Sequence, residues 1–133
     1  MLHKVPTEWV VLRGAFGKIS TAYPKSESKF VDFVGIYKEG ALAIETKETK
    51  ELNRFPFANI KDTQWDFFDD WCSLGGKGYY LIRFTTNKKV FLVEAINFKE
   101  CRDTIGRKSA TYQWFLDNAI EIDYNKLNFI EYI

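Results

Sequence analysis

Two carboxylates and a lysine follow one another at spacings that an antiparallel hairpin would bring together. Asp32 precedes Glu45 by thirteen positions, and Lys47 follows Glu45 by two. Side chains alternate between the two faces of a strand, so Glu45 and Lys47 project to the same side. A turn centred near Gly40 would place Asp32 roughly opposite Lys47. The three side chains are therefore expected to converge at one end of a sheet.

These residue types suit the hydrolysis of a phosphodiester bond. A metal ion offsets the charge of the transition state and activates water. Mg²⁺ prefers hard oxygen ligands and keeps several waters, so Asp32, Glu45 and the backbone carbonyl of Thr46 would suffice to hold it, and Mn²⁺ could replace it. The Lys47 ammonium would orient the attacking water or stabilise charge on the phosphate oxygens. The spacing thus predicts a metal-dependent phosphodiesterase.

The spacing alone also has a plain structural explanation. Because 28% of the residues are charged, the pattern arises easily by chance. The alternative is a surface hairpin whose Glu–Lys pair faces water and contributes about 0–1 kcal/mol. Two features favour a site. Ala43 and Ile44 make the strand apolar up to Glu45, and Gln64 places a polar group on the apolar stripe of the next helix, from which it could reach the site.

The elements that would position these residues follow from periodicity. Residues 30–37 and 41–47 are expected to be strands joined by a tight turn over 38–40, with a loop over 48–56. A helix is expected from about Ile60 to Leu74, capped by Asn59 or Asp62 and ended by two glycines. Its apolar residues lie three to four apart and are Ile60, Phe67, Phe68, Trp71 and Leu74.

The second half of the chain predicts two more strands and further short helices. The strands are expected over 79–84 and 90–94, and a basic loop over 106–109. Residues 9–12 read as either a strand or the start of a helix. The order of elements predicts an α/β (α+β) fold with a mixed β-sheet flanked by helices. The short helices are expected over 95–100, 112–116 and, after a cap at Asp123, 124–132.

Size and composition narrow the class of protein. A length of 133 residues with 46% hydrophobic content predicts a single domain over residues 1–133. The net charge of +1 does not exclude DNA, because acidic residues at a site offset a basic rim. Cys72 and Cys101 lack metal-site spacing and are expected to be reduced thiols. With no signal peptide or bilayer-length apolar run, we expect a soluble cytoplasmic protein.

Three stretches of the sequence and one further residue resemble a known family. They are VDFVGIY at 31–37, AIETKETK at 43–50, FPFANI at 55–60, and Gln64. Their residues and their order along the chain resemble the motifs of the RecU-type Holliday junction resolvases. The resemblance covers roughly residues 30–133. It is far more specific than the spacing of the three charged residues.

The resemblance implies a restriction-endonuclease-like PD-(D/E)xK nuclease that works as a homodimer. Each subunit would nick one of two opposing strands of a four-way DNA junction, in recombination and repair in a Gram-positive bacterium or a phage. It implies metal binding by Asp32 and Glu45, a catalytic role for Lys47 and a supporting role for Gln64. The short segment 1–29 departs from the family and bears on junction specificity more than on nuclease chemistry. A second departure is Thr63, which stands where the family has histidine.

Two further groups of residues have both a functional and a structural interpretation. Basic side chains near the site in sequence would position DNA through its phosphates, or are solvated surface charges. They are Lys18, Lys25, Lys29, Lys50, Arg54 and Lys61. The rings of the predicted helix pack in the core or form the seam of a dimer. They are Trp65, Phe67, Phe68 and Trp71.

Three functions therefore stay open at the level of sequence. The first is a junction-resolving endonuclease. The second is a general, flap-cutting or nicking DNA nuclease, for instance of a phage. The third is a catalytically idle DNA-binding module on the same fold, which substitution of Glu45 by alanine would leave unchanged.

Overall fold

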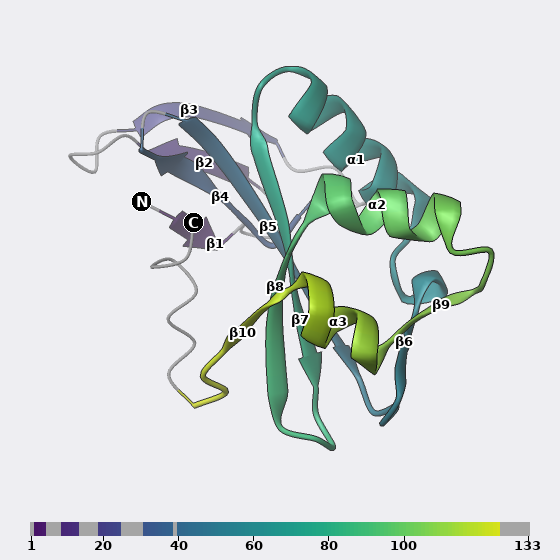
Figure 1. The fold of residues 1–133 in the computed structure, drawn as a ribbon. Helices are drawn as coiled ribbons and strands as arrows, with labels where there is room; N and C mark the ends of the chain where they lie inside the picture. Colours follow the sequence, from purple (N-terminus) through teal and green to yellow (C-terminus); the bar gives the residue numbers. More distant parts are fainter. Residues whose placement is uncertain (1, 5–8, 14–18, 25–30, 39, 126–133) are drawn as a thin grey trace. The chain divides into compact units, whose positions relative to one another are not determined.

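The computed structural model describes residues 2–4, 9–13, 19–24, 31–38 and 40–125 (Figure 1). The chain divides into two compact units, one made of residues 1–45 and 62–78 and the other of residues 46–61 and 79–133. Both units contain strands and helices, so the predicted mixed α/β architecture is confirmed. Among the helices of the described ranges, none has the length and apolar character needed to cross a membrane.

The first unit is built on antiparallel strands. β1 (Leu2–Lys4) pairs with β4 (Phe33–Tyr37), and β4 pairs with β5 (Gly40–Thr49), which continues into the second unit beyond Glu45. A ribbon of β2 (Trp9–Arg13) and β3 (Ile19–Pro24) lies beside them in the same unit. Residues 9–12, which sequence alone left as strand or helix, are therefore strand.

The turn between β4 and β5 is tighter than predicted. Tyr37 pairs with Gly40, so only Lys38 and Glu39 separate the two strands. Lys38 has φ 49°, in the left-handed region that two-residue hairpin turns require. Gly40 was assigned to the turn but is the first residue of β5. This difference changes which residues face each other across the hairpin.

Helix α1 (Asp62–Ser73) is shorter than predicted at both ends. Asn59 belongs to a preceding 3-10 helix, and Asp62 is the first residue of α1, where its carboxylate suits the positive end of the helix dipole. The assignment of Leu74 to the apolar stripe is wrong, because the helix ends before it and its side chain is 88% exposed. The buried side chains of α1 are Gln64, Trp65 and Phe68.

The chain returns closely beneath α1 after the helix ends. The Trp71 indole Nε1 donates a hydrogen bond to the carbonyl of Lys77 at 2.9 Å. A Cβ added to Gly76 would lie 2.4 Å from Trp71 Nε1, and one added to Gly78 would lie 2.4 Å from the Phe68 ring. Glycine at both positions therefore lets the rings of Trp71 and Phe68 pack on the returning chain. These two of the four helix rings are thus explained by packing within the first unit.

Antiparallel strands and two helices form the framework of the second unit. β7 (Lys77–Phe84), whose first two residues belong to the first unit, pairs with β8 (Lys89–Glu94). β8 also pairs with β10 (Ile120–Ile122), a strand that the sequence did not predict. Helices α2 (Ala95–Thr104) and α3 (Tyr112–Asn118) pack against β8 and extend further than predicted (Figure 1).

Aromatic rings fill the core between these strands and helices. Phe115 of α3 lies with its ring centroid 5.3 Å from Phe84 and 5.5 Å from Phe91. Phe98 of α2 lies 5.7 Å from Tyr80 and 5.6 Å from Phe115. All five side chains are fully buried, so many of the phenylalanines serve packing rather than an interface.

A third strand pair occupies part of the region predicted as a loop. β6 (Arg54–Pro56) pairs with β9 (Ser109–Thr111), and the 3-10 helix (Phe57–Asn59) follows β6. The predicted C-terminal helix over 124–132 begins at residues that form a turn, Tyr124 and Asn125. The rest of that helix lies outside the described residues.

Candidate active site

Glu45 is a carboxylate in apolar surroundings. It is the last residue of a buried run on β5 that begins at Leu42, and its exposed fraction is 4%. Gln64 of α1 is 5% exposed and donates a hydrogen bond from Nε2 to Glu45 Oε1 at 3.0 Å. Burying a carboxylate costs several kcal/mol unless hydrogen bonds compensate. The contact with Glu45 therefore explains why a polar side chain occupies the buried face of α1.

Asp32 lies at a bend immediately before β4 and is half-buried. Phe33 pairs with Ile44, so extending the β4–β5 register by one residue places Asp32 across from Glu45. The expectation that Asp32 faces Lys47 is wrong, because the two-residue turn shifts the register by two positions. A shift of two preserves the face of the sheet. Both acidic residues thus belong to the first unit and to one end of its hairpin.

Thr46 and Lys47 are the first residues of the second unit and follow Glu45 directly along β5. Both are half-buried. Strand alternation gives Lys47 the same face of β5 as Glu45. Two residues of a strand span about 7 Å along the chain.

The donor atoms around Glu45 suit a hard cation. The described ranges contain no cluster of three or more His, Cys, Asp or Glu side chains that could hold a metal. Mg²⁺ is commonly held by one or two carboxylates with water in the remaining positions. The two carboxylates and the main-chain carbonyl predicted from the sequence are therefore donors that suit magnesium.

The basic residues predicted to contact DNA divide into two groups. Lys18, Lys25 and Lys29 lie outside the described residues. Lys50, Arg54 and Lys61 are exposed, and Arg54 Nε lies 3.6 Å from Glu51 Oε2. Their contact with DNA stays a prediction. What the sequence did not reveal is that Lys50 and Arg54 line a common pocket after β5.

Two titratable groups in the second unit are held in their neutral form. Burial raises the pKa of the Cys101 thiol, and neither Cys72 nor Cys101 forms a disulfide bond. Burial, and to a smaller extent the Glu94 carboxylate, raises the pKa of Tyr79. A thiol and a phenol with raised pKa values stay protonated at neutral pH. Neither is suited to serve as a nucleophile or base there.

Comparison with known proteins places the chain in a family. The family model described as RecU, Recombination protein U, matches residues 1–133. A Holliday junction resolvase RecU of Oceanobacillus iheyensis is 29% identical and covers 100% of this chain and 71% of its own length. Those of Geobacillus sp. and Bacillus cytotoxicus are 32% and 31% identical, covering 82% and 84% of this chain. The chain spans 58% and 60% of the length of these two relatives. Because the family model matches the whole sequence, the chain belongs to the RecU family.

Proposed function

We propose that the chain is a metal-dependent endonuclease that resolves four-way DNA junctions by paired, symmetric nicks. The observation that carries the proposal is the buried Glu45 carboxylate held by the Gln64 amide. Replacing buried charge by apolar residues is often neutral or stabilising, so such a group is weakly explained by stability alone. A role in chemistry explains why the fold keeps it. The relatives' name, Holliday junction resolvase, supplies the substrate.

Asp32, Glu45 and the Thr46 carbonyl would hold Mg²⁺, for which Mn²⁺ can substitute. The bound ion supplies positive charge against the phosphate and activates water for attack. Directly opposed residues of an antiparallel pair have Cβ atoms about 5 Å apart, which suits two carboxylates that share one cation. Gln64 fixes one oxygen of Glu45 at 3.0 Å and so orients the other toward the site.

Lys47 contributes a positive charge from the same strand. Its ammonium would contact the oxygens of the phosphate under attack, where negative charge grows in the transition state, or orient the water. The half-buried position of Lys47 supports this role, because partial removal from water strengthens the interaction of an ammonium with a phosphate.

The wider setting follows from the substrate. We infer that residues 1–133 act as one nuclease domain, since β5 carries Glu45, Thr46 and Lys47 without interruption. Two cuts on opposing strands require two active sites, so the working form is a homodimer. Because the proposed substrate is chromosomal or phage DNA, we infer that the protein acts in the bacterial cytoplasm.

One experiment separates this function from its two rivals. End-labelled four-way junction, linear duplex and flap DNA are each incubated with the protein and Mg²⁺, and the products are resolved. Paired nicks at symmetric positions in the junction alone are the expected result. Equal cutting of flap or duplex would instead indicate a general or nicking nuclease. No cutting by the native protein, with junction binding intact, would indicate an idle DNA-binding module.

A charge-removing variant of the site is the control. Glu45→Gln keeps a side-chain oxygen that can accept from Gln64, so the fold is retained while the carboxylate is lost. The variant should bind junction DNA in Ca²⁺ as the native protein does, and should not cut it in Mg²⁺. A monomeric mass in light scattering at micromolar protein would refute the two-subunit mechanism. It would not refute the proposed metal-dependent cleavage.

A further inference from the structure

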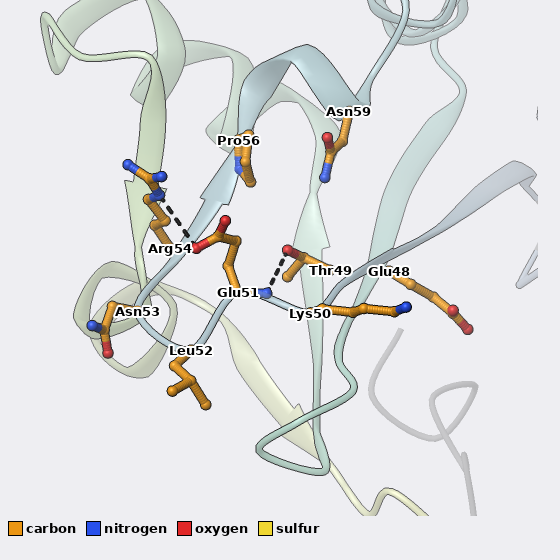
Figure 2. A pocket seen from close by; sticks show the side chains of 9 residues that line it. All are labelled: Glu48, Thr49, Lys50, Glu51, Leu52, Asn53, Arg54, Pro56 and Asn59. Atoms are coloured by element: carbon orange, nitrogen blue, oxygen red, sulfur yellow. Dashed lines mark hydrogen bonds and ion pairs between the residues drawn. The ribbon is translucent and has the colours of Figure 1, made fainter.

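A pocket of about 820 Å³ opens in the second unit at the end of β5 (Figure 2). It is lined by a continuous stretch of chain, Glu48 to Arg54, and by Pro56 and Asn59 from the segment that follows. Small-molecule and cofactor pockets commonly enclose about 300–1,000 Å³, so this one is large enough for a nucleotide. The loop of residues 50–53, which connects β5 to β6, forms one wall.

The backbone of this loop is fixed although its side chains are exposed. Thr86 Oγ1 donates to the carbonyl of Lys50 at 3.0 Å, and Asn87 Nδ2 donates to the carbonyl of Leu52 at 3.0 Å. The backbone N–H of Tyr112 donates to the carbonyl of Asn53 at 2.7 Å. An exposed surface whose main chain is already ordered loses little entropy when it binds a ligand. The loop therefore presents its side chains in a prepared arrangement.

The opposite wall is fixed in the same way. β6 is paired with β9, and the backbone N–H of Phe57 donates to the carbonyl of Lys108 at 3.0 Å. The 3-10 turn is closed by a bond from the Ile60 N–H to the Phe57 carbonyl at 3.0 Å, and Asn59 is its last residue. Figure 2 shows the Asn59 amide pointing from this wall toward the loop.

The charges around the pocket favour a base inside it and a phosphate at its rim. Glu51 projects between the two walls and lies 3.6 Å from Arg54, whose positive charge it offsets (Figure 2). Its carboxylate repels phosphate and accepts hydrogen bonds from amino groups. Figure 2 shows the Lys50 side chain extending away from Glu51 and Arg54, on the side where Glu48 is drawn. In the described part of the chain, neither the Lys50 ammonium nor the Asn59 amide makes an ion pair or side-chain hydrogen bond, so both can serve a ligand.

The chain also links the pocket to the proposed catalytic lysine. Lys47 and Thr49 lie on one face of β5, and the Thr49 hydroxyl accepts from the Glu51 N–H at 3.1 Å in the pocket wall. Lys50 is the first residue after β5, and three residues of extended chain span about 10 Å from Lys47. A DNA strand with a phosphate at Lys47 would thus extend its neighbouring nucleotide over the pocket.

We propose that this pocket binds the base of a nucleotide next to the scissile phosphate and so selects where the strand is cut. Asn59 would make paired hydrogen bonds to the edge of the base, and Glu51 would accept from its exocyclic amino group, which favours adenine or cytosine. Lys50 would contact the flanking phosphate and carry no sequence information. The proposal rests on the proposed nuclease function and assigns that function's sequence selectivity to Asn59 and Glu51.

The test uses four-way junctions that differ only in the base beside each cutting position. The native protein should cut preferentially beside adenine or cytosine, and Asn59→Ala should reduce that preference by about tenfold, the value of one paired contact to a base. Asn97→Ala is the matched control, because Asn97 is an exposed asparagine of the same unit that lies on α2 and does not line the pocket. It should leave the cut positions unchanged.

The role of Lys50 is tested by the salt dependence of junction binding. Lys50→Gln should weaken binding to all four junctions equally and lower the slope of log Kd against log salt by about one. Lys77→Gln, a substitution of an exposed lysine on β7, is the control and should leave the slope unchanged.

Binding in Ca²⁺, followed by fluorescence anisotropy, separates failure of the pocket from failure of the nuclease. If the native protein does not cut but binds the four junctions with different affinities, and Asn59→Ala removes the difference, the pocket reads a base although the proposed function fails. If the native protein cuts all four junctions alike, or Asn59→Ala keeps the native pattern, the inference is wrong while the nuclease stands. Equal binding of all four without cutting would refute both.

Discussion

The buried pair of Glu45 and Gln64 and the exposed loop of residues 50–53 are ordered by opposite means. In the pair, two side chains that are 4% and 5% exposed hold each other through a hydrogen bond. In the loop, every side chain is exposed, and carbonyl groups of the main chain are held by Thr86, Asn87 and Tyr112. One strand, β5, leads from the first arrangement to the second.

The difference suits the two tasks that we propose. A carboxylate that takes part in chemistry must keep one position, and burial among fixed neighbours provides this. Groups that recognise a polymer must remain accessible while losing little entropy on binding. Side-chain substitutions should therefore impair stability and rate together in the buried pair, but recognition alone in the loop.

The largest effect is expected at Lys47, which lies on β5 between the two regions. Lys47→Met keeps the apolar stem and removes the charge, so the single-turnover rate of junction cleavage should fall by about 10²–10³-fold. Lys50→Gln is the control, with less than a tenfold change in rate at saturating protein. Equal losses for the two lysines would mean that chemistry and recognition are not divided along β5.

Substitution of Gln64 is expected to have a smaller effect, which changes both the stability and the Mg²⁺ dependence of cleavage. Gln64→Leu removes the donor to Glu45 Oε1 and leaves a buried acceptor, so the free energy of unfolding should fall by about 1–3 kcal/mol in urea. The Mg²⁺ concentration for half-maximal cleavage should rise by about 10–100-fold. Thr63→Ala, at an exposed neighbouring position, should change neither quantity. A stable and fully active Gln64→Leu protein would contradict the role given to the buried pair.

The main-chain anchors of the loop should affect selectivity more than stability. Asn87→Ala removes the bond to the Leu52 carbonyl and should lower the free energy of unfolding by about 0.5–1.5 kcal/mol. The loop then samples more positions, so cut sites should spread over neighbouring bases at a nearly unchanged total rate. Asn97→Ala, on the exposed surface of α2, provides the comparison. Unaltered cut sites would show that the loop needs no anchor.

The smallest effect is expected for the ion pair of Glu51 and Arg54. Arg54 and Glu51 are 59% and 50% exposed, and such pairs contribute about 0–1 kcal/mol. Arg54→Gln should therefore leave the urea midpoint almost unchanged. A loss well above 1 kcal/mol would mean that side chains, as in the buried pair, hold the loop in place.

Sequence reasoning recovered the elements whose evidence is local. The alternation around Val34 and Ile44 predicted the hairpin, and the helical spacing predicted that Gln64 faces inward. The register failed because a Lys-Glu-Gly stretch reads as a turn, whereas Gly40 pairs with Tyr37. The pattern of the residues contains no signal for that single pairing.

The elements that were missed depend on partners distant in the sequence. β5 extends to Thr49, whose carbonyl accepts from the N–H of Thr85. β6 has only three residues and is ordered by β9, which lies more than fifty positions away. Short segments of this kind have too few residues to show a period. The pocket after β5 could not be predicted for the same reason.

The two-residue turn after Tyr37 has a consequence for natural variation and for engineering. Because Asp32 and Glu45 face each other through a fixed register, the number of residues between them decides which side of the sheet each one occupies. Insertion or deletion of a single residue there would turn one carboxylate to the opposite side, whereas changes of two would retain the side. Homologous sequences should therefore align across this interval without gaps of odd length, and tags or inserted domains belong elsewhere in the chain.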